Sequence, residues 1–528
     1  MGGIGAEAQP AQSRSRRGLQ IRELVLSISP GFAAALITLA FVLVTEWWLT
    51  QDSRVPEFDP GLHTSFAFQF HDQLSHGHLL AWFNDWTQYP PLVHTIGALT
   101  TFIAGKGIWP GVIAENLIFV PLLAAGCYGA ARITYKSELA GLLAVIFALG
   151  TPMIISQFHE FMIDAPETAL VAASIWLIFA SGHFERIGMS AWAGAAVGLG
   201  LMTKESFPAF IAGVVIVAAV YAVMQRNWRG LAVFAAVAIV IALPWYIRHW
   251  GQVQDLRHIA SQPGTDNSAG SGLPHRYSAK NAGWFLWSGL NIQNFAPLLA
   301  FAAVGVGTAI VRLFKRPWRE PLTLALLVGG LIAWAGATYS LPHDPRYSLP
   351  GLPYLAILGA GWITLLRPRA RLVAAIVLSA IAVVNVLTIS FGVGHRVAIS
   401  LPGAPKNSGL HERQLTLISD QGFAYGKPQR SGDLLGLMRD LHERNVRYIL
   451  WDLPAANSAA FNTEGLTALA QSAGLKIGKP PPGRQREGVI LVHLASGQSK
   501  VPPCRKLYDG TDTYVYFATE RVLNACPF

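Results

Sequence analysis

The sequence has few charged residues for its length. Only 13% of its 528 residues are Asp, Glu, Lys or Arg, while 52% are hydrophobic and the mean hydropathy is +0.38. A typical soluble domain carries about 25% charged residues. This composition excludes an ordinary water-soluble core and predicts a polytopic membrane protein. The net charge of +10 does not indicate nucleic-acid binding, because the basic residues stand in short clusters between apolar runs.

Cysteine is scarce as well, with three residues in the chain. Cys127 lies in an apolar run, where we expect inert packing. Cys504 and Cys526 flank a polar C-terminal stretch. We predict that they form a disulfide if this stretch lies in an oxidising compartment. The basic N-terminus lacks a short apolar core with a small-residue cleavage site, which favours a retained signal anchor over a cleaved signal peptide.

Apolar runs recur along most of the chain. We predict about eleven membrane spans, at 25–48, 110–131, 139–157, 165–182, 189–203, 206–224, 231–247, 283–311, 321–340, 349–365 and 371–393. The run PPLVHTIGALTTFIAG (90–105) is too short to cross a bilayer, so we place it along the interface as an amphipathic helix.

Charge orients these spans. With a cytoplasmic N-terminus, every strongly basic short loop falls inside, as the positive-inside rule requires. The predicted organisation is a basic cytoplasmic segment (1–24), an all-α transmembrane domain (25–393) and a small extracytoplasmic α/β domain (394–528). Residues 49–109 form the first extracytoplasmic loop with its interfacial helices. GDLLGLMRDLHERN has helical spacing, while VRYILWD and GVILVHLA are typical of buried strands. The predicted location is the cell (inner or plasma) membrane.

Ionisable residues from separate outer loops fall on one face of this domain. They include Asp59, His63, Glu160, Asp164, Lys204, Glu205, His343, Asp344 and Arg346. Because such residues at span ends are costly to desolvate, they usually pair or take part in function. Structural alternatives stay open. Asp59 and Asp164 can cap helices, Lys204 can pair with Glu205 or Asp164, and Arg346 can be an interfacial anchor.

The first outer loop also allows a metal site. His71, Asp72, His76 and His78 could hold a divalent ion, but their spacing matches no standard site. We therefore expect no metal cofactor and keep a divalent ion as an alternative. The tryptophans near this loop are typical of an interfacial aromatic belt (Trp47, Trp48, Trp82 and Trp86).

Motifs along residues 25–365 resemble the polytopic glycosyltransferases of the GT-C fold, especially the bacterial protein-mannosyltransferase and aminoarabinose-transferase-like branch. They are FDPGLH (58–63), YPPL (89–92), FMIDAPETAL (161–170), GLGLMTKES (198–206) and RYSLPGLPYLAILGAG (346–361). The chain departs from the family pattern at three places. Pro60 follows the first aspartate, Tyr89 stands where a lysine is common, and His159 and Phe161 stand where an arginine usually precedes the second aspartate.

The resemblance implies a polyprenyl-phosphate-linked sugar donor and transfer to a glycan, lipid or protein acceptor on the outer face. It implies that Asp59 and Asp164 are catalytic and that Lys204 and Arg346 lie near the donor phosphate. We add Tyr347 to the donor-phosphate group, and we predict substrate contacts for His63, Tyr89, Glu160 and His343.

The chemistry of this transfer fits these residue types. A positioned carboxylate can take the acceptor's proton, and fixed cations can stabilise the leaving phosphate. We therefore hypothesise an inverting transfer with Asp59 as the general base. Two other functions stay open: a transporter or lipid flippase, and a non-catalytic scaffold that binds lipid or glycan. Transporters tend to carry inverted repeats and midplane polar sites, whereas the polar residues here gather at one face.

Overall fold

The computed structural model of the chain describes residues 29–54, 56, 59–85, 87–261, 279–315, 320–339, 344–401, 414–421, 423, 425–429, 434–443, 446–452, 469–478, 488–494, 505–509 and 513–518. Four predictions lie outside these residues: the basic segment 1–24, the place of Trp86 in an aromatic belt, the role of His343 and the Cys504–Cys526 disulfide. They stay predictions.

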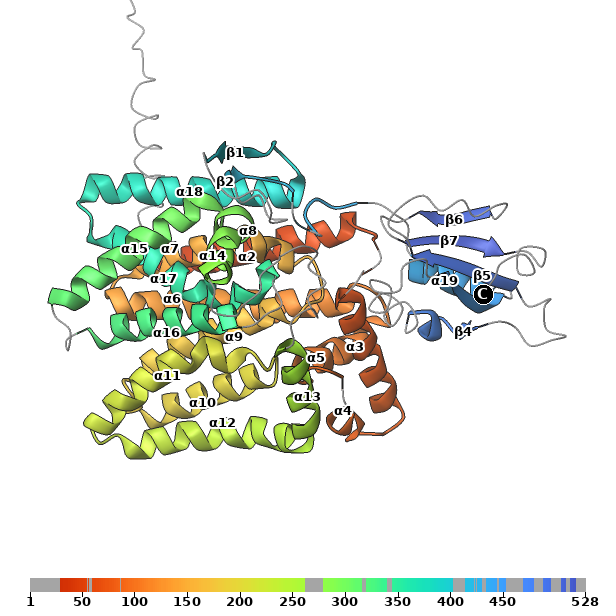
Figure 1. Cartoon of the computed structure of the whole chain (residues 1–528), viewed down its shortest axis with the longest axis horizontal. Helices are drawn as coiled ribbons and strands as arrows, with labels where there is room; N and C mark the ends of the chain where they lie inside the picture. The colour runs from red at the N-terminus through yellow and green to blue at the C-terminus, as the bar shows by residue number, and fades with distance from the viewer. Residues whose placement is uncertain are drawn as a thin grey trace, which may run out of the picture.

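Long apolar helices form most of the molecule (Figure 1). Among the described residues, eight segments are long and apolar enough to cross a membrane: α2 (Pro30–Gln51), α6 (Pro110–Tyr135), α11 (Phe207–Met224), α12 (Trp228–Arg248), α15 (Phe295–Lys315), α16 (Pro321–Tyr339), the Pro345–Leu365 segment that contains α17 (Leu352–Gly361), and α18 (Pro368–Phe391). The chain is therefore a multi-pass membrane protein.

The remaining predicted spans correspond to shorter helices. They are α7 (Glu138–Leu149), α9 (Asp164–Ala180) and α10 (Ile187–Leu201). The predicted span 139–157 is broken after α7, because Pro152 opens a new helix, α8 (Pro152–Gln157). The predicted span 283–311 is also broken. It comprises α14 (Ala279–Ser288), a short π-helix (Gly289–Gln293) and α15, which starts at Phe295 with a φ of 57° that no helix interior adopts.

The centre of the bundle is built from small residues that let helices approach closely. The residues of α9 are buried along nearly the whole helix, which packs against α6. A Cβ on Gly126 of α6 would lie 2.5 Å from the backbone carbon of Ala172. Small residues at such contacts are typical of membrane helix pairs. This packing fixes the start of α9, and with it Asp164, relative to the rest of the bundle.

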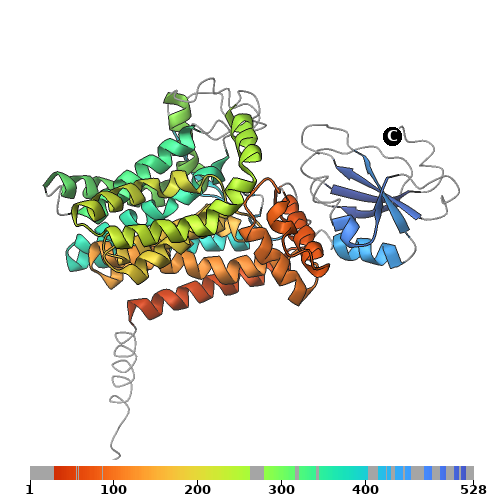
Figure 2. The same ribbon diagram turned by 90° about the horizontal axis from the view of Figure 1, so that it is seen from below.

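The first outer loop folds into helices α3 (Asp59–Ser75), α4 (Ala81–Asn84) and α5 (Leu92–Ala104). They lie at one end of the bundle, as Figures 1 and 2 show. The 13 residues of α5 span about 20 Å, less than the roughly 30 Å hydrocarbon core of a bilayer. This length fits the predicted interfacial placement. Leu99, Phe102 and Ile103 of α5 are exposed, as expected of a face that meets lipid.

The tail combines helices and strands, as its sequence pattern predicts. Strands β1 (Val397–Ser400) and β2 (Gln414–Ile418) pair antiparallel. A second sheet has the order β4-β3-β5-β7-β6, from β4 (Lys476–Ile477), β3 (Val446–Asp452), β5 (Gly488–Leu494), β7 (Thr513–Ala518) and β6 (Arg505–Asp509). The first three strands are parallel, and the last two run antiparallel to their neighbours.

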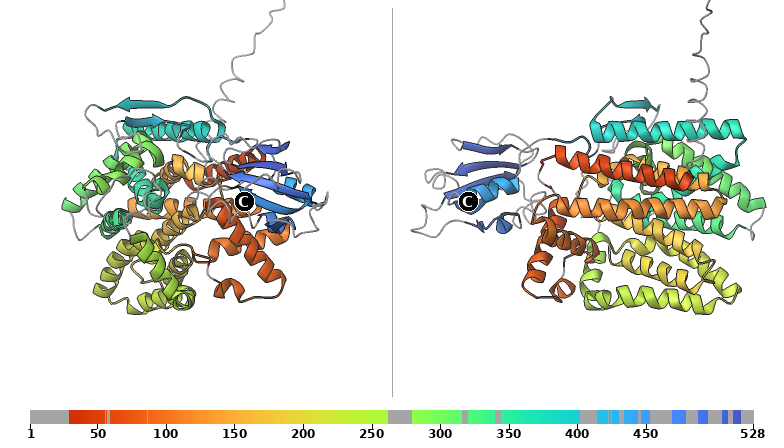
Figure 3. Two further views of the ribbon diagram at one scale, coloured as in Figure 1. Left: turned by 45° about the vertical axis from the view of Figure 1, so that its right-hand side comes forward. Right: turned by 180° about the vertical axis from the view of Figure 1, so that it is seen from behind.

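This second sheet carries helix α19 (Leu434–Glu443) and lies at the same end of the molecule as α3 (Figure 3). Phe68 of α3 packs into its hydrophobic core with Leu435 and Met438. The tail therefore touches the helix that begins with Asp59. On the bundle side, α13 (Trp250–Ser261) continues from α12 at this end.

Candidate active site

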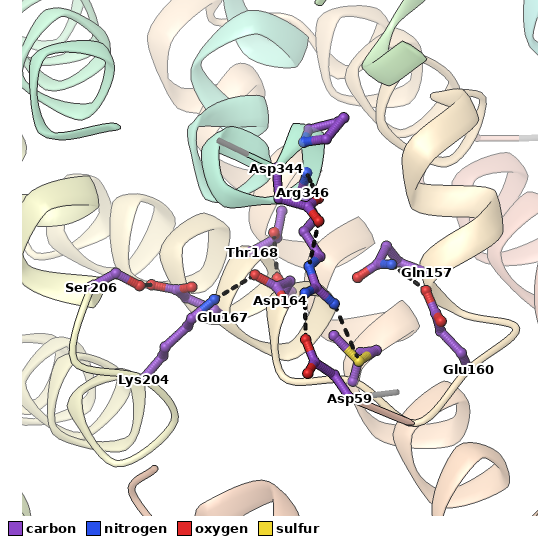
Figure 4. A network of polar contacts seen from close by, with 12 residues as sticks. Asp59, Gln157, Glu160, Asp164, Glu167, Thr168, Lys204, Ser206, Asp344 and Arg346 are labelled. Carbon is purple, nitrogen blue, oxygen red and sulfur yellow. Dashed lines mark hydrogen bonds and ion pairs between the residues drawn. The ribbon is translucent and has the colours of Figure 1, made fainter. Parts of the chain in front are cut away.

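Two ion pairs lie side by side where α3, α9, the turn before α11 and the turn before α17 meet (Figure 4). Arg346 pairs with Asp59, and Lys204 pairs with Asp164. Asp59 and Arg346 are 287 positions apart in the sequence. The structure thus brings together four predicted site residues from four separate segments.

Arg346 is held by two carboxylates. Its Nη2 donates to Oδ2 of Asp59, and its Nε lies 3.4 Å from Oδ2 of Asp344. Asp344 also caps the 3-10 turn Pro345–Gly351, because its Oδ1 accepts from the backbone N–H of Arg346 at 3.0 Å. Nη1 of Arg346 lies 3.8 Å from the sulfur of Met162. These partners fix the guanidinium within the protein, so Arg346 is more than an interfacial anchor.

Lys204 and Asp164 form the second pair, 2.6 Å from Nζ to Oδ1. The Asp164 side chain is only 2% exposed, and Asp164 is the first residue within α9, whose N-cap position is Ile163. The capping interpretation is therefore wrong for this residue, and the alternative pairing with Lys204 is confirmed. Burial alone would lower the pKa of Lys204, but the charges of Asp164 and Glu167 outweigh burial and raise it. Lys204 is therefore a permanent cation.

Tyr347 links the two pairs. Its ring centroid lies 5.2 Å from Nζ of Lys204 and 5.5 Å from Cζ of Arg346. Both distances are in the range of cation–π attraction. The two cations therefore share one aromatic neighbour, as expected if both face the same ligand.

His63 lies one helical turn after Asp59 on the same side of α3. Its Nδ1 is 2.9 Å from Nε2 of His94, and its ring centroid is 5.2 Å from that of Tyr89. Burial, with smaller effects of the nearby cations Arg346 and Lys204, lowers the pKa of His63 to about 3. Burial also lowers the pKa of His94 well below its ordinary value. Both imidazoles are therefore neutral at pH 7.

Glu160 lies in the buried loop 158–163, beside the two pairs. Nε2 of Gln157 donates to its carboxylate. Burial, together with the charges of Asp164, Asp344 and Asp59, raises the pKa of Glu160 to about 8 against the opposing charge of Arg346. Glu160 is therefore mostly protonated at pH 7 and can donate a hydrogen bond.

Three buried residues of the site were missing from the sequence prediction. Glu115 of α6 accepts from the backbone N–H of Met162 at 3.2 Å, and Glu167 accepts from Ser206 at 2.7 Å. The third is His94. An acid inside an apolar run marks Glu115 as functional or paired, and Glu167 is three residues from Asp164, on the same side of α9. Both signals are present in the sequence.

The residues of the metal alternative have other partners. His71 Nδ1 lies 2.7 Å from Oγ1 of Thr101, and Asp72 pairs with Lys106 at 2.6 Å. Within the described part of the chain, no three His, Cys, Asp or Glu residues are grouped as metal ligands. The geometry thus offers the divalent-ion alternative no donor set in this region.

A cavity of about 630 Å³ lies elsewhere, between α2 and α6. Its lining is mostly apolar and includes Gly31, Ala34, Pro121 and Ala125. Gly31 and Ala34 lie in the first half of α2, and Pro121 and Ala125 lie near the middle of α6, whereas Asp59 follows the other end of α2. This cavity is therefore separate from the ion-pair site.

The bundle of apolar helices, with its ionisable site and its small α/β domain at one end, has the same fold as the GT-C protein ArnT. The sequence model of the family "Dolichyl-phosphate-mannose-protein mannosyltransferase" matches residues 88–250, which include Tyr89, Asp164 and Lys204. A comparison with curated proteins finds no match.

Solved structures that share this fold include the following two. ArnT from Cupriavidus metallidurans bound to undecaprenyl phosphate is 14% identical, with a TM-score of 0.56 over 92% of this chain and 98% of that chain. The oligosaccharyltransferase AglB from Archaeoglobus fulgidus, in complex with an inhibitory peptide and a dolichol-phosphate, is 10% identical, with a TM-score of 0.50 over 88% of this chain and 69% of that chain. The resemblance to GT-C glycosyltransferases predicted from the sequence is confirmed.

Proposed function

We propose that this protein is a glycosyltransferase that moves a sugar from a polyprenyl-phosphate donor to an acceptor at the membrane surface. The observation that carries the proposal is the meeting of the Asp59–Arg346 and Asp164–Lys204 pairs beside Tyr347. Further support comes from the match of residues 88–250 to a mannosyltransferase family and from the ArnT-like fold. The ArnT structure contains undecaprenyl phosphate, and the AglB structure contains a dolichol-phosphate.

The two cations are suited to a leaving phosphate. Arg346 can offer a bidentate fork and Lys204 a point charge to the developing negative charge. Both lie in largely buried positions, with side chains 18% and 13% exposed. Electrostatic stabilisation is stronger there than in water. We assign both residues to donor-phosphate binding, with Tyr347 beside them.

Asp59 is better placed than Asp164 to act as the general base. Its side chain is 22% exposed, against 2% for Asp164. In this mechanism the donor phosphate accepts hydrogen bonds from the Arg346 guanidinium in place of Asp59. The Asp59 carboxylate is then available to the acceptor hydroxyl. Asp164 then keeps Lys204 in place and does not contact the acceptor.

The transfer is a single displacement with inversion. The acceptor oxygen attacks the anomeric carbon from the face opposite the phosphate, and its proton passes to Asp59. The bond from the anomeric carbon to the phosphate oxygen breaks, and polyprenyl phosphate leaves between Lys204 and Arg346. His63, Tyr89 and the protonated Glu160 provide hydrogen-bonding groups for the sugar.

We place this site on the extracytoplasmic side. The short loops at the other end of the helices carry basic residues such as Arg132, Arg186, Arg229, Arg312 and Arg367. The positive-inside rule assigns that end to the cytoplasm. The tail with its α/β sheet then lies outside, next to the site.

The test uses the purified full-length protein in liposomes. Polyprenyl-phosphate-linked hexoses and pentoses are supplied one at a time with membrane extract as the acceptor source, and release of polyprenyl phosphate is measured. We expect release from at least one donor, and its loss in Arg346→Ala. If folded wild-type protein consumes none of the donors, the transporter or scaffold functions gain support and the proposal fails.

A further inference from the structure

A segment of the tail crosses the outer end of the helix bundle and bonds to several of its elements. We call its described residues 414–421, 423 and 425–429 the strap. Oγ1 of Thr416 donates to Asn291 at 3.0 Å. Farther along, the carbonyl of Gly426 accepts from the Trp48 indole at 2.7 Å, and the backbone N–H of Gln429 donates to Asp52 at 2.7 Å. The strap is thus fixed to the short π-helix before α15 and to the end of α2.

His159 connects this strap to the site. Its Nδ1 lies 2.8 Å from the carbonyl oxygen of Tyr425, and its ring stacks on Trp48 at 4.1 Å with the planes 1° apart. Because a carbonyl can only accept, the proton must be on Nδ1. Nε2 can then accept from Ser390 Oγ, 3.4 Å away. Burial lowers the pKa of His159 to about 3, so this neutral form persists at pH 7.

The loop that contains His159 leads directly into the ion-pair site. Residues 158–163 are all buried, and Asp164 follows at the start of α9. The loop carries Glu160, and it carries Met162, whose sulfur lies 3.8 Å from Nη1 of Arg346. Its polar attachments include His159 to the strap, at 2.8 Å, and the N–H of Met162 to Glu115, at 3.2 Å. We therefore expect a shift at His159 to displace Glu160 and the Met162 sulfur that contacts Arg346.

We propose that His159 is a positioning residue through which the strap holds the loop 158–163 in its active geometry. The C-terminal tail is then part of the catalytic unit. The expected loss of transfer rate rests on the proposed function, whereas the expected loosening of the loop 158–163 does not. A misplacement of about 1 Å near reacting groups can reduce the rate by about a hundredfold.

Two substitutions separate the hydrogen bond from packing. His159→Phe keeps a ring that can stack on Trp48 but has no N–H. His159→Asn loses the stacking but can place an amide N–H near the position of Nδ1. A third variant, His183→Phe, is a control for loss of an imidazole far from the site. His183 also stacks on an aromatic ring, Tyr221, at 5.1 Å, but it lies near the basic end of the bundle.

The first measurement is hydrogen exchange of the full-length protein without any ligand. In His159→Phe we expect at least tenfold faster exchange across residues 158–163, including the Met162 amide. In His159→Asn and His183→Phe this loop should exchange at the wild-type rate. Unchanged exchange of the loop in His159→Phe would overturn the inference, whatever the protein's activity.

The second measurement is kcat and melting temperature with a donor that wild-type protein uses. We expect kcat to fall at least tenfold in His159→Phe and to stay within about threefold of wild type in His159→Asn, although the Asn variant loses the ring. If kcat instead follows the melting temperature across the three variants, His159 is only a packing residue. If wild type uses no donor while the exchange result holds, the proposed function fails and the strap inference stands.

Discussion

Asp59→Asn tests the assignment of the general base. The substitution keeps the size of the side chain and removes its ability to accept a proton at neutral pH. General-base catalysis contributes typically 10²–10⁴-fold to a rate, so we expect kcat to fall by about that factor. The Michaelis constant for the donor should not rise, because Lys204 and Arg346 remain and the phosphate no longer competes with the Asp59 carboxylate for Arg346.

The stability effect of this change should be small. Arg346 keeps Asp344 at 3.4 Å after Asp59 is neutralised, and the Arg346 and Asp59 side chains are 18% and 22% exposed. Partly exposed pairs of this kind contribute about 1 kcal/mol or less. A shift in melting temperature of about 2 °C or less is therefore expected. A large kinetic effect with a small thermal effect separates catalysis from folding.

Asp72→Asn is the matched control. Asp72 is also on α3 and also pairs with a cation, Lys106 at 2.6 Å, but its side chain is 55% exposed and distant from Arg346 along the helix. We expect transfer at the wild-type rate in this variant. If Asp59→Asn keeps more than about a third of wild-type kcat, or if Asp72→Asn loses as much, Asp59 is not the base.

Three further results are expected. Lys204→Met leaves Asp164 buried without a counter-charge and should destabilise the fold by about 3–5 kcal/mol. The double variant Lys204→Met/Asp164→Asn should recover much of this loss in thermal unfolding. No recovery would mean that Lys204 and Asp164 are not coupled. The pKa of Glu160 is about 8 in the folded protein, against an ordinary value of 4.5. Between these pH values the folded protein holds a proton that the unfolded chain releases, so the stability of the wild type relative to Glu160→Gln should fall as pH rises from about 4.5 to 8. A stability difference that does not depend on pH would contradict this. A Cβ at Gly97 would lie 2.7 Å from the Phe161 ring, whereas a Cβ at Gly307 would meet open space. Gly97→Ala should therefore lower the melting temperature and the transfer rate, and Gly307→Ala should change neither. Equal effects of the two substitutions would refute the close packing of α5 on the loop 158–163.

Much of the architecture could be predicted from the sequence because its signals are local. Apolar runs and basic loops place α2, α6 and α18 without knowledge of their neighbours. The short run that becomes α5 is recognised by its length alone. The convergence of Asp59 and Arg346 followed from alternation of the spans, since both residues fall at outer ends.

The pairing of individual side chains could not be predicted. Lys204 stands next to Glu205 in the sequence but pairs with Asp164, because the packing of α9 against α10 and α11 brings the two together. Trp48 was expected in an interfacial belt, and this prediction is wrong. Its side chain is fully buried, because the strap covers it and the carbonyl of Gly426 accepts its indole N–H. Such contacts depend on where a distant segment returns, which hydropathy does not encode.

The most direct test of a donor-phosphate site is a structure of the full-length protein with undecaprenyl phosphate bound. We expect the phosphate oxygens at about 3 Å from both Nζ of Lys204 and the guanidinium of Arg346. The Asp59 carboxylate should then be free of Arg346 on at least one oxygen. A phosphate bound away from both cations, for example at the mouth of the cavity between α2 and α6, would contradict the proposed site.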